Sequence, residues 1–284
     1  MANDTIFTLT SGRSGTRFLS ELLHATLSDC RVEHEPYLQR GNPTMFGLPI
    51  YDHSTGNLDA VRECVAQKRN AIERYRARCY IETSHAFLKS WWDIAPEFFP
   101  RMKVLHLIRH PLEVAKSEAN REAFIHRWHL PRRNYRGRDG RRYFFWALTG
   151  NEPIFHSHGL TNLTRFQHYL VQWIEIENRA MSFLQRFDMS ASCMTLHTPH
   201  AFVDSQVVDK LIEFIGLERK PDSAIAPRYR NRTPGRPTGL GNEDLRQCRQ
   251  IVESIPSGYL EIFHHAPYSL CEWSGLLRKR VGCF

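Results

Sequence analysis

The chain has 284 residues, of which 42% are hydrophobic and 24% charged, and its net charge of +8 suits a polyanionic ligand. This length can bury a large core and fits one α/β domain with insertions. We expect a cytoplasmic protein with free thiols, because the sequence shows no signal peptide, no membrane-length apolar run and no metal-ligand spacing among its seven cysteines.

The first predicted elements are a strand, a short loop and a helix. Apolar residues form the strand Thr5–Thr10, small residues occupy 11–15, and apolar residues then recur at helical spacing up to Leu23. Such a loop directs backbone N–H groups and a helix N-terminus at an anion. Two arginines and two hydroxyl groups add donors, so we expect a phosphate or a sulfate to bind here. The candidate binding residues are Arg13, Ser14, Gly15, Thr16 and Arg17.

This loop differs from the usual nucleoside triphosphate-binding loop. That motif has a Lys directly after its last Gly, to reach the β and γ phosphates, and then a Ser or Thr that holds magnesium. Here Thr16 follows Gly15, and Arg17 comes next. We therefore expect the anion to be held without a metal. A magnesium-dependent small-molecule kinase, which would use the same type of loop, is the first alternative.

Two more short strands are expected at Arg31–His34 and Cys79–Glu82, and each is followed by a residue that can accept a proton. Glu35 follows the first strand and His85 follows the second. Strands that alternate with helices indicate a parallel sheet covered on both faces, with ligands bound beyond the carboxyl ends of the strands. Glu35 and His85 should then lie at the same edge of the sheet as Arg13.

A fourth strand, Lys103–Ile108, leads into a second cationic junction. Arg109 stands at its carboxyl end, and Pro111 then opens a helix at a position where its missing N–H costs little. Ser117 lies about two helical turns beyond Arg109, so both side chains can face one pocket edge. We expect a second phosphate to be bound there by one charge and one hydroxyl.

Residues 127–142 interrupt the alternation of strands and helices. They contain seven arginines and one acid, Asp139, and four aromatic residues follow at Tyr143–Trp146. A cationic flap over the ligand or an acidic acceptor is about as well supported as a solvated loop anchored by its aromatics. Arginine beside aromatics can also stack on single-stranded nucleic acid, but no known nucleic-acid motif accompanies it. We assign an insertion to about 121–163 within a single domain, 1–284.

The last predicted elements are a long helix at Phe166–Phe187, a fifth strand from Cys193 to Leu196 and a helical segment from about residue 243. A Pro- and Gly-rich stretch with several arginines, residues 228–241, precedes that segment. A plain linker and a mobile loop over the ligand explain it equally well. In the second case Arg230 and Arg232 would contact the phosphates of the ligand.

Two segments within these elements resemble sulfotransferases that use 3′-phosphoadenosine 5′-phosphosulfate (PAPS). SGRSGTRFL is similar to the family's 5′-phosphosulfate loop, and LIRHPLEVAKS is similar to its 3′-phosphate motif, with Arg109 and Ser117 at the family's spacing. The resemblance implies an α/β fold, with a P-loop-like parallel β-sheet flanked by helices on both faces, and PAPS as sulfuryl donor. Where many members have Tyr-Glu-Asp-Leu, this chain has HTPH at 197–200.

The resemblance also implies catalytic roles. Arg13 stands where many soluble members have a Lys, and a guanidinium there would stabilise charge on the leaving phosphate without giving up a proton. Glu35 matches a Glu of the branches that have Arg at this place, and His85 lies near the catalytic His of the Lys-type branch. We expect Glu35 to be the general base, with a pKa raised by burial, and His85 to be the alternative.

No motif encodes the acceptor, the choice between O- and N-sulfation, or the oligomeric state. The sequence therefore predicts an enzyme that transfers a sulfuryl group from PAPS to a hydroxyl or amine of a small molecule or carbohydrate, releasing 3′,5′-bisphosphoadenosine. The alternatives are a magnesium-dependent phosphoryl transferase on the same fold and a basic nucleic-acid-binding protein. The second is the weaker of the two, because it depends on residues 127–142 alone.

Overall fold

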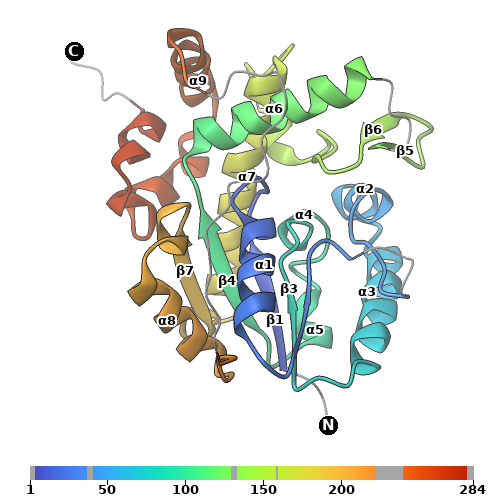
Figure 1. The fold of residues 1–284 in the computed structure, drawn as a ribbon. Coiled ribbons are helices and arrows are strands. Elements are labelled where there is room, and N and C mark those ends of the chain that lie inside the picture. Colours follow the sequence, from blue (N-terminus) through green and yellow to red (C-terminus); the bar gives the residue numbers. More distant parts are fainter. Residues whose placement is uncertain (1–3, 37–40, 129–132, 158, 222–238, 280–284) are drawn as a thin grey trace.

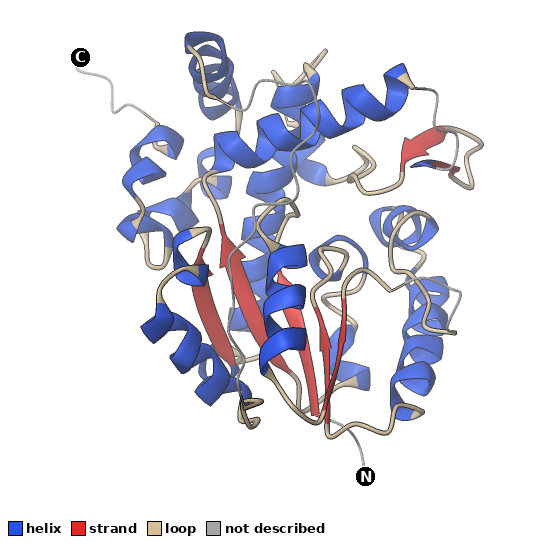
Figure 2. Ribbon diagram, in the orientation of Figure 1, coloured by secondary structure: helices blue, strands red, loops and turns tan. Residues whose placement is uncertain are grey.

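A computed structural model describes residues 4–36, 41–128, 133–157, 159–221 and 239–279. Within this part of the chain, the central sheet has five parallel strands in the order β2-β3-β1-β4-β7. They are β1 (Asp4–Leu9), β2 (Cys30–Glu33), β3 (Cys79–Glu82), β4 (Lys103–Ile108) and β7 (Cys193–His197). The predicted α/β class with a parallel sheet is confirmed (Figures 1 and 2).

Helices cover both faces of this sheet, as the sequence predicts. They are α1 (Thr16–Thr26), α2 (Leu48–Ser54), α3 (Leu58–Glu73), α4 (Phe87–Ser90), α5 (Ala95–Phe98), α6 (Pro111–Arg127), α7 (Arg165–Arg186), α8 (Ser205–Ile215) and α9 (Asn242–Ser254). Short 3₁₀ turns between residues 257 and 277 complete the C-terminal segment. No helix in the described residues has both the length and the apolarity needed to cross a membrane.

The strand β1 explains why both faces need cover. Ile6 packs in one apolar cluster with residues of α1 and α8, whereas Phe7 and Leu9 pack in a second cluster on the opposite face. Side chains alternate between the two faces along a strand, so an apolar run such as IFTL buries both. The strand therefore lies in the middle of the molecule, and the loop that follows it emerges at the carboxyl edge of the sheet (Figure 1).

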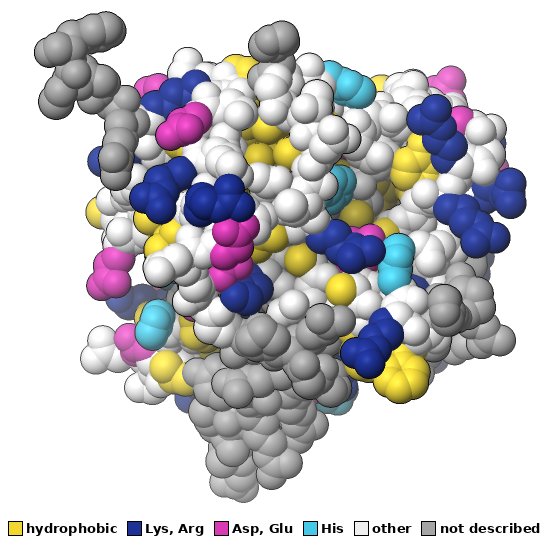
Figure 3. Space-filling model, turned by 90° about the horizontal axis from the view of Figure 1, so that it is seen from above, with side chains coloured by type: hydrophobic (Ala, Val, Ile, Leu, Met, Phe, Trp, Pro, Cys, Tyr) yellow, Lys and Arg dark blue, Asp and Glu magenta, His cyan; other side chains and the backbone are white. Residues whose placement is uncertain are grey.

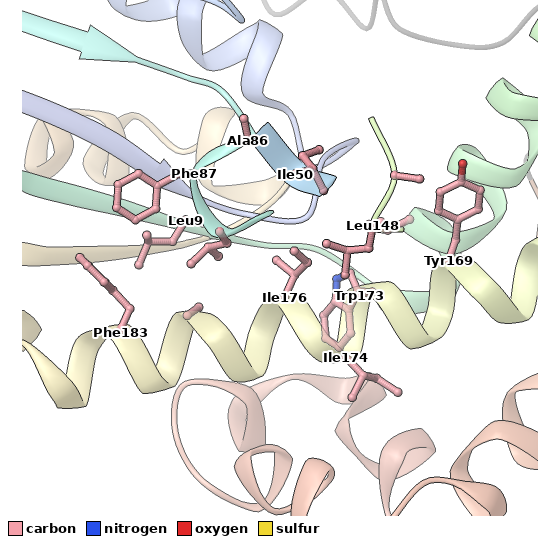
Figure 4. Packing of buried hydrophobic residues seen from close by; sticks show 14 of the residues in the cluster. Leu9, Ile50, Ala86, Phe87, Leu148, Tyr169, Trp173, Ile174, Ile176 and Phe183 are labelled. Carbon is pink, nitrogen blue, oxygen red and sulfur yellow. The ribbon is translucent and has the colours of Figure 1, made fainter. Parts of the chain in front are cut away.

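The second cluster is built mainly on α7. This helix begins with a capping box, in which Thr164 and Gln167 bond to each other's backbone N–H. Trp173, Ile176 and Phe183 are fully buried along it. Figure 4 shows Ile176 and Phe183 on the side of the sheet and the α4 segment, whereas the Trp173 ring stacks on Phe263 of the C-terminal segment at 5.5 Å. Because α7 fixes α4, it also fixes the part of the chain that follows β3.

The predicted insertion contains a small hairpin, β5 (Asn134–Arg136) and β6 (Arg142–Phe144), which lies above α2 (Figure 1). Phe144 and Trp146 are buried in the main core. The aromatic residues thus anchor this segment, as one of the two interpretations of the sequence expects. The arginines of the hairpin are considered further below.

One prediction concerns the core around β1. The Phe7 ring lies 5.0 Å from the Trp91 ring and 5.1 Å from the Phe99 ring. Replacing Phe7 with Ala leaves a cavity against these rings, so the free energy of unfolding should fall by about 3–5 kcal/mol. Phe98→Ala, at a half-buried position, serves as the control and should cost clearly less. Urea unfolding of both variants measures the difference, and equal losses would contradict this description of the core.

Candidate functional site

The loop between β1 and α1 has an unusual backbone. Gly12, Arg13 and Gly15 all have positive φ angles, of 103°, 53° and 94°. Non-glycine residues seldom adopt this conformation, so Arg13 is held in it by its surroundings. The loop then leads into α1, whose N-terminus has no side-chain cap among the described residues. Its first N–H groups therefore remain available to an anion.

The two glycines allow the close approach of other elements to this loop. A Cβ atom on Gly12 would lie 3.0 Å from the His85 ring and from the Glu118 carboxylate. A Cβ atom on Gly15 would lie only 2.6 Å from the Phe202 ring. The segments after β3 and β7 and the helix α6 thus pack directly on the loop.

Arg13 joins the two sequence motifs. Its Nε donates to the Oγ of Ser117 at 2.9 Å, across 104 positions of sequence. The Nη1 of Arg109 donates to the backbone oxygen of Arg13, also at 2.9 Å. The structure therefore brings these three predicted donor-binding residues together. Burial lowers the pKa of Arg13, and the charge of Glu118 partly offsets this.

Arg109 has a second partner. Its Nε and Nη2 both donate to the carboxylate of Glu113, one turn into α6, at 3.1 and 2.8 Å. This ion pair is about one-third exposed on the Arg109 side, so it is weak enough to be exchanged for a phosphate. Arg109 is thus oriented toward the loop while part of its guanidinium stays accessible.

The other predicted binding residues are placed less uniformly. Ser14 is buried, and its Oγ donates to the oxygen of Gly12, so this hydroxyl shapes the loop. Thr16 is the first residue of α1 and is also buried. Arg17 is half-exposed and pairs with Glu21 along α1. Arg230 and Arg232 lie outside the described residues.

Thr198 braces the loop from the far side of the sheet. It follows β7, and its Oγ1 donates to the backbone oxygens of Ser14 at 2.9 Å and of Ile108 at 3.3 Å. One hydroxyl thus ties the loop after β1 to the end of β4. From the sequence, residues 197–200 are recognised only as a departure from the family pattern, and no role is expected for Thr198.

The two candidate bases form a pair. The Nε2 of His85 lies 3.3 Å from the Oε1 of Glu35, and His34 approaches the same oxygen at 3.8 Å. Glu35 is in the left-handed region, with φ 49°, which turns the chain at the end of β2. The side chain of Glu35 is 17% exposed and that of His85 only 1%. Glu35 is therefore the member of the pair that a ligand can reach.

The expected rise in the pKa of Glu35 is wrong. Burial does raise this pKa, but the contact with His85 and the charges of His34 and Arg121 outweigh it, and the pKa falls to about 2. Burial together with the charge of Lys89 lowers the pKa of His85 to about 4. At neutral pH, Glu35 is therefore ionised and His85 is neutral. The pair carries one negative charge and can accept one proton.

Beneath this pair lies a buried group of charges that the sequence analysis misses. Lys89, on α4, is fully buried, and its Nζ donates to the backbone oxygen of Trp146 at 2.6 Å. Glu118 on α6 is 1% exposed, and its Oε2 lies 2.5 Å from the Nη2 of Arg121. Burial lowers the pKa of Lys89 to about 7, although the charge of Glu118 opposes this.

This group has a clear electrostatic effect. Glu118 places one buried negative charge among Arg13, Lys89 and Arg121, and it acts on the first two of them. Glu118 therefore offsets part of the positive charge around the loop while no anion is bound. The sequence contains one signal for this arrangement, because a Lys within the apolar run AFLKSWW at 86–92 is unusual for an exposed residue.

Among the described residues, no three His, Cys, Asp or Glu side chains are grouped as ligands of a metal ion would be. The polar groups that the loop offers are backbone N–H groups, hydroxyls and guanidinium groups. The site is thus chemically suited to a multiply charged anion.

Comparisons with known proteins found no matching family model and no matching curated protein. Two solved structures are similar in fold, each at 16% identity and a TM-score of 0.45. The sulfotransferase domain from the curacin biosynthetic pathway is covered over 76% of its length by 78% of this chain. A sulfotransferase from Alicyclobacillus acidocaldarius is covered over 91% by 88% of this chain. Both of these proteins are sulfotransferases.

A second prediction tests the close packing on the loop. Gly12→Ala would add both backbone strain and contacts at 3.0 Å with His85 and Glu118. Gly56 is the matched control, because its φ of 77° is also positive but a Cβ atom there meets nothing within 4 Å. We expect Gly12→Ala to reduce the free energy of unfolding by about 1–3 kcal/mol more than Gly56→Ala. Equal losses in urea unfolding would show that the loop does not pack as described.

Proposed function

We propose that this chain is a PAPS-dependent sulfotransferase. The observation that carries this proposal is the arrangement of Arg13, which bonds to Ser117 and accepts a bond from Arg109 beside an uncapped helix N-terminus. Two anion-binding features, one after β1 and one after β4, are thus adjacent at one edge of the sheet. A donor with a phosphosulfate at one end and a separate 3′-phosphate matches two such features.

The donor would be held in two places. The 5′-phosphosulfate would take the N–H groups of the loop and of α1, with Arg13 beside the bridging oxygen. The 3′-phosphate would take the guanidinium of Arg109 and the hydroxyl of Ser117, in exchange for part of the contacts these groups now make with Glu113 and Arg13. Thr198 would hold the loop in place throughout.

The transfer step follows from the two sides of the site. The acceptor's oxygen or nitrogen attacks sulfur, the bond from sulfur to the bridging phosphate oxygen breaks, and the acceptor's proton passes to the Glu35–His85 pair. Glu35 is ionised and is the more exposed of the two, so it would take the proton directly. The neutral His85 would share that proton and orient the carboxylate. Arg13 would stabilise the charge that develops on the leaving phosphate.

The two substrates would approach the loop from opposite sides of the sheet edge. Arg109 and Ser117 follow β4, whereas Glu35 follows β2 and His85 follows β3. In the strand order β2-β3-β1-β4-β7, the loop with Arg13 lies between these two sides. The donor would thus extend toward β4, and the acceptor would enter from the side of β2 and β3. This opposition suits an in-line displacement at sulfur.

A phosphoryl transferase is the second candidate. It would use the same uncapped helix and loop, but the position after Gly15 is Thr16 instead of the Lys that reaches the β and γ phosphates. No specific feature of the site favours this activity over sulfuryl transfer.

The third prediction tests the base. Glu35→Gln keeps the shape of the side chain but cannot take a proton, so kcat with labelled PAPS should fall by a factor on the order of 100 to 10,000. Donor affinity should change little, because Glu35 lies on the acceptor side. His85→Asn should lower kcat less, since the carboxylate remains. Glu21→Gln, an exposed acid on α1, is the control and should be active.

The opposite pattern of activities would reassign the base. A nearly normal Glu35→Gln enzyme together with an inactive His85→Asn enzyme would make His85 the base. A loss in Glu35→Gln that appears only in the acceptor KM would show that Glu35 binds the acceptor and takes no proton.

A further inference from the structure

The hairpin β5–β6 carries an unusual distribution of charge. Arg136, Arg141 and Arg142 are all exposed on it, and Arg138 is half-exposed. The one acid of this hairpin, Asp139, already accepts hydrogen bonds from the Tyr143 hydroxyl at 2.7 Å and from the backbone of residue 141 at 3.0 Å. Its contact with the Arg141 guanidinium is long, at 3.9 Å. The hairpin thus presents a net positive surface.

Some other exposed arginines of this protein have a carboxylate partner. Arg62 pairs with Glu97, Arg69 with Glu73, and Arg246 with Glu243. Within the described residues, by contrast, no carboxylate lies within ion-pair distance of Arg136 or Arg142. Arg136 and Arg142 therefore carry charge that no carboxylate of the described residues offsets at ion-pair distance.

The register of the hairpin places two arginines opposite each other, which lowers its folding stability. Arg136 and Arg142 are directly opposite each other in the antiparallel pairing. Like charges at such a position repel each other, and a two-stranded hairpin has little stability of its own. An anion bound between the two guanidinium groups would remove the repulsion. The arrangement is therefore unfavourable for folding and favourable for binding an anion.

The hairpin is nevertheless held firmly against the acceptor side of the site. The N–H of Gly47 donates to the oxygen of Phe145 at 3.1 Å, and the Phe46 ring lies 5.8 Å from the Phe145 ring. Phe46 in turn lies 4.6 Å from the ring of His85. Arg138 also pairs with Asp52 on α2. Two aromatic side chains thus connect the hairpin to the candidate base.

The surface shows the same relation. Figure 3 looks down on the top of the molecule in Figure 1, and Lys and Arg side chains lie at its right edge, on the side of the hairpin, as well as across its left part. Hydrophobic side chains appear in the recessed part of this face next to that right edge. The donor motifs at Arg109 and Ser117 follow β4, farther along the sheet. The arginines of the β5–β6 hairpin therefore border the proposed path of the acceptor.

We infer that the β5–β6 hairpin is an acceptor-docking surface and that the acceptor carries carboxylate or sulfate groups besides the hydroxyl or amine that is sulfated. The identification of the bound anion as the acceptor rests on the proposed function, whereas the anion-binding surface itself does not. The guanidinium groups of Arg136 and Arg142 bind one anionic group between the strands. The anchoring aromatics keep the bound acceptor close to Glu35.

The fourth prediction compares a charged probe with its neutral counterpart. Fluorescently labelled trigalacturonate, with three carboxylates, and its methyl ester are titrated with the full chain, with 3′,5′-bisphosphoadenosine present, and anisotropy is followed. We expect the acid to bind at least about tenfold more tightly than the ester. In Arg136→Gln/Arg142→Gln, acid binding should weaken about tenfold, as expected for two exposed charge-assisted contacts, and ester binding should stay unchanged.

The matched control removes the same charge elsewhere. Arg186→Gln/Arg249→Gln changes two exposed arginines outside the hairpin and should keep acid binding within about twofold. The melting temperature of Arg136→Gln/Arg142→Gln should equal or exceed that of the wild type, because the cross-strand repulsion is gone. A melting temperature several degrees lower would show that the two arginines are structural and would overturn the inference.

Other outcomes are also decisive. Equal binding of acid and ester, or unchanged acid binding in the hairpin variant, overturns the inference. Single-stranded DNA of equal charge that displaces trigalacturonate and binds far more tightly overturns it in favour of a nucleic-acid surface. The hairpin variant should keep its affinity for 3′,5′-bisphosphoadenosine. A wild type that discriminates acid from ester but does not bind the bisphosphate would instead contradict the proposed function and leave the anion-binding surface standing.

Discussion

The hydrogen bond from Arg13 to Ser117 is the contact on which the site depends. It joins the loop after β1 to the helix after β4, and the bond from Arg109 to the oxygen of Arg13 closes the same junction. Parallel strands make this possible, since the carboxyl ends of β1 and β4 meet at one edge of the sheet. Both contacts help to hold Arg13 in its unfavourable φ. Backbone strain and binding geometry are thus set by the same residue.

Charge balance is the second constraint. Arg13, Arg121 and Lys89 lie close to one another beneath the loop, and burying these cations together would be unfavourable without a counter-charge. Glu118 provides this charge from within the site, and Glu35 adds a second one on the acceptor side. A bound donor would bring further negative charge to the loop, where the exposed part of Arg109 and the α1 N-terminus can receive it. The hairpin differs at Arg136 and Arg142, which have no carboxylate at ion-pair distance within the described residues.

The sequence predicts the strands and the loop between β1 and α1 well because both depend on local patterns. The apolar runs at Lys103–Ile108 and Cys79–Glu82 coincide with the observed strands, and glycines mark the loop. The pKa of Glu35 could not be predicted, because His85 lowers it from a position fifty residues away. The hairpin strands have three residues each, too few to show an alternating pattern. Lys89 and Glu118 become neighbours of the site only through the packing of α4 and α6.

The central claim is that this loop binds a donor with a separate 3′-phosphate, and thermal unfolding with ligands tests it most directly. With chelator present, saturating 3′,5′-bisphosphoadenosine should raise the melting temperature of the wild type, by an amount that grows with ligand concentration. The increase should be much smaller in Arg109→Ala, which removes the charged contact to the 3′-phosphate. ATP with magnesium should protect neither protein. Protection by ATP with magnesium, together with no effect of the bisphosphate, would contradict this account.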